Sequence, residues 1–115
     1  MESHRTWSAV DSDGRVIGVL APHEHSQSSE IYLIAVRPEW HRRGVGRALI
    51  DAFEANAIAR SVPLAQVKTL GPSDPDAGYA LTRKFYSALG YLELEETMDL
   101  WPETPALIMV KPLPA

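Results

Sequence analysis

The sequence predicts an α/β fold with a mixed sheet, and three consecutive features support this prediction. The apolar run Ile31–Val36 has the composition of a central strand, and we expect it to be covered on both faces. A turn with two glycines, a helical pattern over Val45–Arg60 and the apolar segment Leu64–Leu70 follow. Because a strand, a helix and a strand in this order form a right-handed crossover, we expect the two strands to be parallel.

The segments before the central strand predict a β-hairpin. Trp7–Val10 and Arg15–Leu20 have strand composition, and the turn-forming segment Asp11–Gly14 lies between them. The polar segment Ala21–Glu30 is predicted to be a loop. Pro38 is expected to end the central strand, because proline cannot donate to the hydrogen-bond ladder.

The segments after the parallel pair predict one more helix and two more strands. The helix is expected over Ala77–Leu89 and is ended by Gly90. The strands are expected over Tyr91–Glu95 and Leu107–Val110, with Trp101, Pro102 and Pro105 in the connection between them. The predicted apolar stripe of the helix consists of Leu81, Phe85, Ala88 and Leu89. A separate stripe beside it consists of Tyr79, Thr82 and Tyr86.

Composition and charge restrict the classes of function. The 115 residues suffice for a single domain over 1–115, and the net charge of −4 does not favour a nucleic-acid binder. The absence of cysteine excludes disulfides and thiolate catalysis, and the four histidines lack metal-site spacing, so no metal is expected. No apolar run reaches the length of a membrane span, and the polar segment Met1–Arg5 leads into no signal sequence. We therefore expect a cytoplasmic protein without a membrane segment.

The turn after the central strand has the chemistry of a phosphate site. A helix start leaves backbone N–H groups without partners and carries a partial positive charge, which favours anions. Gly44 and Gly46 allow a ligand to approach the backbone, and Arg42, Arg43 and Arg47 add positive charge. The alternative is an ordinary strand-to-helix turn with solvated arginines. The coincidence of strand, glycines, arginines and helix favours phosphate binding.

This segment resembles the GNAT superfamily of N-acetyltransferases. The family motifs Val-x-Pro and Arg/Gln-x-x-Gly-x-Gly/Ala correspond to Val36–Pro38 and His41–Gly46, with His41 where the family usually has Gln or Arg. The resemblance implies a mostly antiparallel sheet with a central parallel strand pair and flanking helices. It also implies that the turn binds the pyrophosphate of acetyl-CoA. The cofactor-binding residues implied in this way are Ile34, Ala35, Val36, Arg42, Arg43, Gly44, Val45, Gly46 and Arg47.

A second resemblance lies in the predicted second helix. The segment Tyr86–Tyr91 is similar to the family element Tyr-x-x-x-Gly-Phe/Tyr, which implies that Tyr86 is the general acid that protonates the CoA thiolate. Many members have Asn where this chain has Tyr79, seven residues earlier. A tyrosine at the edge of the core is the alternative for Tyr86. In the family, a backbone N–H at a strand bulge near Ala35–Val36 binds the thioester oxygen.

Other polar residues have two interpretations each. Glu30 either accepts a proton from the acceptor amine through water or is a solvated loop carboxylate. His41 either binds phosphate or is a solvated turn residue, and Trp40 is expected to pack over the turn. An acidic run that is typical of a solvated face, but that could attract a cationic amine, consists of Glu93, Glu95, Glu96 and Asp99.

The leading hypothesis is an N-acetyltransferase that transfers acetyl from acetyl-CoA to a primary amine of a small molecule or peptide. The alternatives are a non-catalytic CoA-binding module and a regulatory domain that binds a phosphate or nucleotide. Family members usually have a strand and two helices before the hairpin, and this chain begins almost at the hairpin. The Trp7–Val10 strand would then lie at a sheet edge, which favours a homodimer over a monomer whose N-terminal segment covers that edge.

Overall fold

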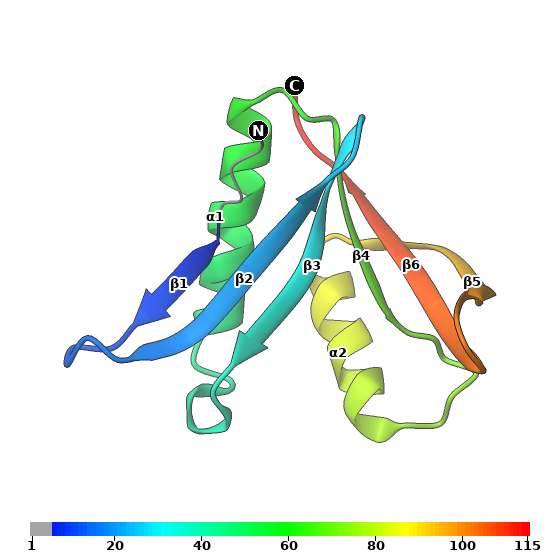
Figure 1. Ribbon diagram of the computed structural model, residues 1–115, viewed down its shortest axis with the longest axis horizontal. Coiled ribbons are helices and arrows are strands. Elements are labelled where there is room, and N and C mark those ends of the chain that lie inside the picture. The colour runs from blue at the N-terminus through cyan, green and yellow to red at the C-terminus, as the bar shows by residue number, and fades with distance from the viewer. Residues whose placement is uncertain (1–5) are drawn as a thin grey trace. The chain divides into compact units, whose positions relative to one another are not determined.

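The computed structural model describes residues 6–115 and contains, within that range, six strands and two α-helices (Figure 1). The strands form one mostly antiparallel sheet in the order β1-β2-β3-β4-β6-β5, with β3 and β4 as the parallel pair. This confirms the predicted fold class. The segment Met1–Arg5, for which no signal sequence was expected, lies outside the described residues. The elements in chain order are β1 (Trp7–Val10), β2 (Val16–Glu24), β3 (Ser28–Val36), the 3₁₀ helix η1 (Pro38–Trp40), α1 (Val45–Ala59), β4 (Leu64–Leu70), α2 (Ala77–Ala88), β5 (Leu92–Trp101) and β6 (Thr104–Pro112).

The chain forms two compact units. The first comprises the residues up to Ala65 together with Leu113–Ala115, and the second comprises Gln66–Pro112. In the first unit β1, β2 and β3 pair in antiparallel fashion, and α1 contacts all three strands (Figure 1). Its core includes Leu20, Ile50 and Phe53 at no more than 1% exposure.

Gly18 allows α1 to lie close to β2. A Cβ atom at this position would lie 2.9 Å from Val45 Cγ1 and 3.1 Å from Leu49 Cδ1. The first turn of α1 therefore packs directly on the backbone of β2. On the next turns Leu49, Ile50, Phe53 and Ala57 are buried, as the predicted stripe requires. This packing fixes where the helix begins.

The second unit contains α2 and the β5–β6 hairpin. Trp101 pairs with Thr104, so the hairpin turn consists of Pro102 and Glu103, and Glu103 has a φ of 54°. β6 supplies core residues, among them Leu107 and Met109. Gly90 has a φ of 98° directly after α2, which confirms its role in ending that helix.

Three element predictions were wrong. The predicted loop Ala21–Glu30 belongs mostly to strands, because β2 extends to Glu24 and β3 begins at Ser28. The two final strands are longer than predicted, so Trp101 and Pro105 lie in strands and not in the connection. The central strand is not covered on both faces at its apolar end, since Tyr32 is 71% and Leu33 51% exposed.

The predicted apolar stripe of α2 is not buried, and of the second stripe Tyr86 is buried whereas Tyr79 is 45% exposed. Leu81 is 59% and Phe85 37% exposed, whereas Tyr86 of the second stripe is only 4% exposed. Tyr86 packs edge-on against Tyr91, with ring centroids 5.9 Å apart. The aromatic ring of Tyr86 therefore makes the buried contact of α2. Among the helices of the described residues, neither is long and apolar enough to cross a membrane.

Candidate functional site

The turn between β3 and α1 has the backbone geometry of an anion site. η1 begins at Pro38, and α1 begins after Gly44, which has a φ of 83° and no side chain that could cap the helix. Arg42 is also left-handed, with a φ of 63°. Left-handed residues before a helix start turn successive N–H groups toward one side, and such concavities bind anions.

His41 connects this turn to the end of the central strand. Its Nε2 donates a hydrogen bond to the carbonyl oxygen of Val36 at 2.9 Å. The backbone N–H of His41 also donates to the carbonyl oxygen of Pro38 at 3.1 Å. The ring is therefore hydrogen-bonded to the backbone through Nε2, while the residue itself is exposed.

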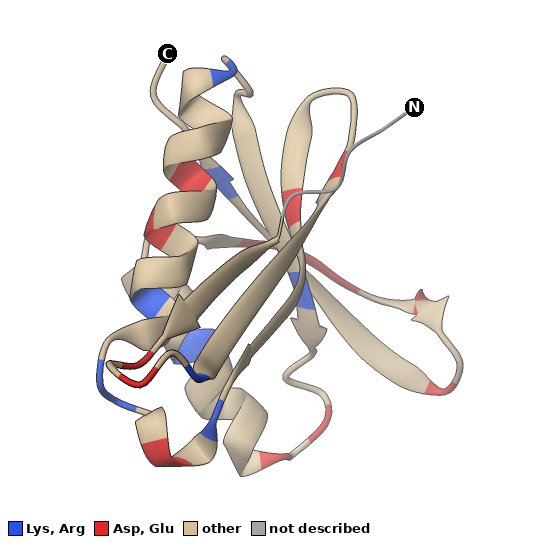
Figure 2. Ribbon diagram, turned by 60° about the vertical axis from the view of Figure 1, so that its left-hand side comes forward, with Lys and Arg blue, Asp and Glu red and all other residues tan. Residues whose placement is uncertain are grey.

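The neighbouring side chains of the turn are also held in place. The Arg43 guanidinium lies over the Trp40 ring at 4.2 Å from its centroid, so Trp40 packs against the turn as expected. Arg37 donates from Nε to the carbonyl oxygen of Val16 at 2.8 Å, which ties η1 to β2. In Figure 2 the turn before α1 and the beginning of α1 carry blue segments of Lys and Arg. The cationic surface thus coincides with the helix start.

An open groove adjoins the turn within the first unit. It measures about 290 Å³ and is lined by residues 16–19 of β2, by Ala35 and Val36 of β3 and by Arg37. Val36 lines this groove, and its carbonyl oxygen accepts the hydrogen bond from His41. The groove and the turn of residues 37–44 between β3 and α1, called the anion turn from here on, therefore meet at the end of β3. Its lining is almost entirely apolar apart from Arg37, which suits an uncharged flexible chain.

The register of β3 differs from the expectation at one point. β3 pairs regularly with β2 over Ile34–Val36, and the irregularity lies at Tyr32, opposite the step from Ala21 to Pro22. Pro22 has no N–H to donate, which explains why the ladder shifts beside it. The bulge expected near Ala35–Val36 is therefore not found in the pairing with β2.

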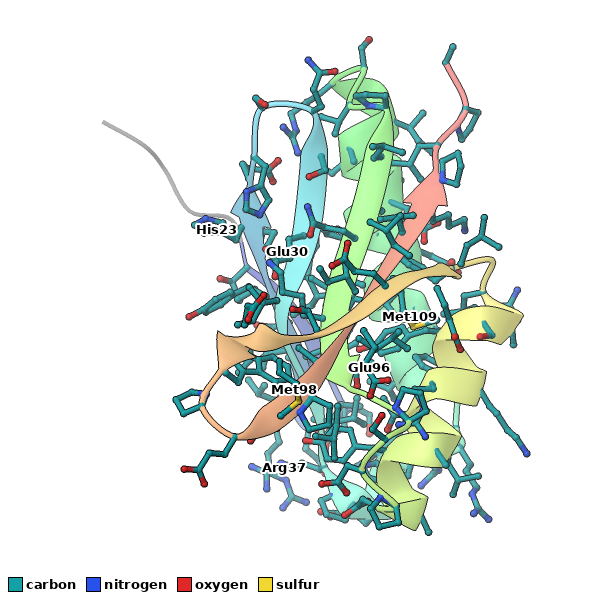
Figure 3. All side chains as sticks on the ribbon, turned by 90° about the vertical axis from the view of Figure 1, so that its right-hand side faces the viewer. His23, Glu30, Arg37, Glu96, Met98 and Met109 are labelled. Atoms are coloured by element: carbon teal, nitrogen blue, oxygen red, sulfur yellow. The ribbon has the colours of Figure 1, made fainter. Side chains whose placement is uncertain are left out.

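Glu30 is a strand residue and not a solvated loop carboxylate. It lies in β3 at 5% exposure, and its Oε1 accepts a hydrogen bond from His25 Nε2 at 2.7 Å. His23 on β2 is the cross-strand partner of Glu30 (Figure 3). The ring centroid of His23 lies 4.8 Å from that of His25. A buried carboxylate with an imidazole at hydrogen-bonding distance can exchange protons with it.

Tyr86 in the second unit is a protonated phenol in the physiological range. Burial, and to a smaller extent the nearby Tyr79, raise the pKa of Tyr86 to about 12. Desolvation disfavours the phenolate, so the proton stays on the oxygen. A group in this state can donate a proton but does not act as a base near neutral pH.

One member of the acidic run has a structural role. Glu96 accepts hydrogen bonds from the N–H and the Oγ of Ser73, both at 2.9 Å. Its side chain covers Gly71, where a Cβ would lie 2.8 Å from Glu96 Cδ. Glu96 therefore holds the loop before α2, whereas Glu93 and Glu95 are exposed, as predicted for a solvated face.

Sequence reasoning missed His25, Gly18 and the structural role of Glu96. His25 and Gly18 carry no local signal of their roles, because both depend on contacts with another element. The sequence signal for the role of His25 was the closeness of His23, His25 and Glu30 along the chain. Among residues 6–115, no group of three or more histidines and carboxylates is arranged to hold a metal ion.

Comparison with known proteins gives consistent results. The family model described as the acetyltransferase (GNAT) domain matches residues 2–93. A curated relative from Streptomyces virginiae, an uncharacterized N-acetyltransferase in the mutA 5′ region, is 33% identical over 76 residues. The matched part is 66% of this chain and 32% of that protein, so the chain spans about a third of its length.

Solved structures share the fold at low sequence identity. The ribosomal-protein-S18-alanine N-acetyltransferase from Escherichia coli has a TM-score of 0.82 and 21% identity, over 100% of this chain and 72% of that one. A structure from Bacillus anthracis strain Ames in complex with acetyl coenzyme A has a TM-score of 0.84 and 16% identity. That match covers 99% of this chain and 65% of the other.

Proposed function

Because this chain belongs to the GNAT acetyltransferase family, we propose that it transfers an acetyl group from acetyl-CoA to a primary amine of a small molecule or peptide. The anion turn before α1 is the observation that supports this proposal most directly. It combines two left-handed residues, an uncapped helix start and a stacked arginine within residues 40–45. This arrangement suits the pyrophosphate of a nucleotide cosubstrate.

In the proposed complex the first unit binds the cosubstrate. The N–H groups of Gly44, Val45 and Gly46 donate to the pyrophosphate, with Arg42, Arg43 and Arg47 around them. The uncharged arm that links the pyrophosphate to the thioester extends along the groove beside Ala35 and Val36. The fold likeness to a structure that contains acetyl coenzyme A supports this choice of cosubstrate.

The chemistry of the proposed reaction requires three proton or charge movements. The acceptor ammonium loses a proton, and Glu30 is the proposed base. The neutral amine attacks the thioester carbon, and a backbone N–H among Ile34, Ala35 and Val36 stabilises the oxyanion. The C–S bond then breaks as Tyr86 donates its proton to the departing thiolate, and the second proton of the nitrogen passes in return to the Tyr86 oxygen. The products are the acetylated amine and CoA.

An assay with acetyl-CoA and a panel of primary amines tests the proposal. Release of CoA thiol that depends on the amine, together with the acetylated product by mass spectrometry, is the expected result. Titration of CoA by calorimetry in parallel distinguishes two ways in which the proposal can fail. Binding without turnover on any amine would make the chain a CoA-binding module, and absence of binding would reject the cosubstrate itself.

We also propose a homodimer in which β1 takes part. β1 is the first strand in the sheet order of the described residues, and Val10 on it is 58% exposed. An exposed strand edge can pair with the same edge of a second copy. Light scattering over a range of concentrations should give about twice the 12.7 kDa of one chain, and a mass near 12.7 kDa at every concentration would reject the dimer.

A further inference from the structure

His41 has two anchors on the short segment that leads from β3 to the anion turn. Its ring donates to the carbonyl oxygen of Val36, the last residue of β3, at 2.9 Å. Its backbone N–H donates to the carbonyl oxygen of Pro38 in η1 at 3.1 Å. The ring thus closes a loop of six residues, although the residue itself is exposed. An exposed side chain that is held in this way reduces the freedom of the backbone around it.

These two hydrogen bonds lie directly before the residues of the turn that have a left-handed backbone conformation. Arg42, the next residue, takes the unfavourable left-handed conformation with a φ of 63°. Gly44 follows with a φ of 83° and leads into α1. A non-glycine residue at such a φ persists when the surrounding contacts fix it. The bond from His41 to Val36 is the side-chain contact immediately before this strained step.

We propose that His41 is a positioning residue of the cosubstrate site, which ties the anion turn to the end of β3 so that the N–H groups before and in α1 face the pyrophosphate. This inference rests on the proposed function for the identity of the ligand. His41 touches backbone and not substrate, so the role differs from that of Arg42 or Gly44.

Calorimetric titration with dephospho-CoA tests the proposal on three proteins: wild type, His41→Gln and His41→Ala. Dephospho-CoA retains the pyrophosphate and lacks the 3′-phosphomonoester, so its binding reports on the pyrophosphate site. His41→Gln is the matched variant, because its amide N–H₂ can donate to Val36.

His41→Ala should bind about 3- to 10-fold more weakly than wild type, as the loss of one hydrogen bond implies, and His41→Gln should bind within about 2-fold. Equal affinities of wild type and His41→Ala would overturn the proposal.

NMR order parameters of the backbone amides from Arg42 to Gly46, measured without ligand, give a readout that does not depend on CoA. We expect lower order in His41→Ala and wild-type order in His41→Gln. If wild type binds no dephospho-CoA, the proposed function fails, and these order parameters still decide the positioning role. Equal order in all three proteins would reject it.

Discussion

The Nε2 atom of His25 lies 2.7 Å from Oε1 of Glu30, a carboxylate that is buried near the polar beginning of β3. This pair connects an internal carboxylate to a partly exposed imidazole, since the side chains of Glu30 and His25 are 7% and 37% exposed. A buried base needs such a route for the proton that it accepts. The pair is therefore the first place to test the catalytic proposal.

Replacement of Glu30 by Gln should lower kcat for acetyl transfer by about 10-fold or more, because the amide keeps the shape of the side chain but accepts no proton. The apparent affinity for acetyl-CoA should change little, since Glu30 is not in the anion turn. Steady-state kinetics with the best amine of the panel measures both. His25→Gln, which leaves the carboxylate in place, is the comparison variant. Wild-type turnover by a folded Glu30→Gln protein would remove Glu30 from the mechanism.

Tyr86→Phe should lower kcat by about 10-fold or more while the affinity for CoA stays similar. The ring and its packing against Tyr91 remain, and only the proton is lost. Because the pKa of Tyr86 is raised to about 12, wild type should show no alkaline loss of kcat from this group below about pH 11. A pH–rate profile measures this. An alkaline limb near pH 9 that disappears in Tyr86→Phe would contradict the raised pKa of Tyr86. Wild-type kcat in Tyr86→Phe would contradict its role as the acid.

The same phenol makes stability depend on pH in the alkaline range. The phenol of the unfolded chain titrates near 10, and that of the folded chain near 12. The protonated form is thus favoured by folding, and its contribution is fully present below about pH 10 and lost as pH rises toward about 12. The difference amounts to about 2 to 3 kcal/mol. Urea unfolding of wild type and Tyr86→Phe at about pH 9 and 11.5 should show a smaller decrease for the variant, and equal decreases would contradict this account.

Gly18→Ala should destabilise the protein by about 1 to 3 kcal/mol, because the new methyl group meets Val45 Cγ1 at 2.9 Å and Leu49 Cδ1 at 3.1 Å. The start of α1 has to move away from β2, so affinity for CoA should also decrease. Val45→Ala removes one of the two opposing atoms. In a double-mutant cycle by urea unfolding, the double variant should be more stable than the sum of the single changes implies, by at least about 0.5 kcal/mol. Strict additivity would show that the contact with Val45 does not cause the loss.

Glu96→Ala should destabilise the second unit by about 1 kcal/mol, because the N–H and the hydroxyl of Ser73 lose their acceptor. Glu95 is the matched control, since it lies next in the same strand and is exposed. Its replacement by Ala should change the free energy of unfolding by less than about 0.5 kcal/mol. Similar losses for the two variants in thermal or urea unfolding would show that Glu96 has no special role.

The elements that depend on local pattern were predictable from the sequence. β4 coincides with the predicted strand Leu64–Leu70, and α1 begins at Val45 as expected, because glycine before an amphipathic pattern marks the boundary. The turn between β3 and α1 could be singled out as a candidate phosphate site for the same reason, since its glycines, arginines and flanking elements are contiguous. The left-handed conformation of Gly44 is a finding of the structure that the sequence analysis did not predict.

The features that depend on distant partners were not predictable. The segment Ser28–Glu30 is polar, so it was assigned to a loop, yet it is buried. Ser29 donates to Glu24 across the hairpin, and Arg60, directly after α1, donates to Glu24 and to Ser29. On α2 the periodicity defined two adjacent stripes but not which of them faces the core. The buried tyrosine, with its larger surface and its contact to Tyr91, decided that choice.

The central claim is that the N–H groups at the start of α1 bind the pyrophosphate of acetyl-CoA, and a pair of glycines tests it most directly. Gly44 and Gly14 both have a φ of 83°, and a Cβ at either position would meet nothing within 4 Å. Alanine at either site should therefore cost a similar amount of stability, about 1 kcal/mol, from backbone strain alone. Gly44 lies in the anion turn, whereas Gly14 lies in the β1–β2 turn.

The decisive measurement is the dissociation constant of CoA by calorimetry for wild type, Gly14→Ala and Gly44→Ala, at a temperature where all three are folded. We expect Gly44→Ala to bind about 10-fold or more weakly, because its methyl group and the strained backbone disturb the N–H groups that face the phosphate, while Gly14→Ala binds as wild type does. Equal affinity for all three proteins, or equal loss in both variants, would contradict the claim.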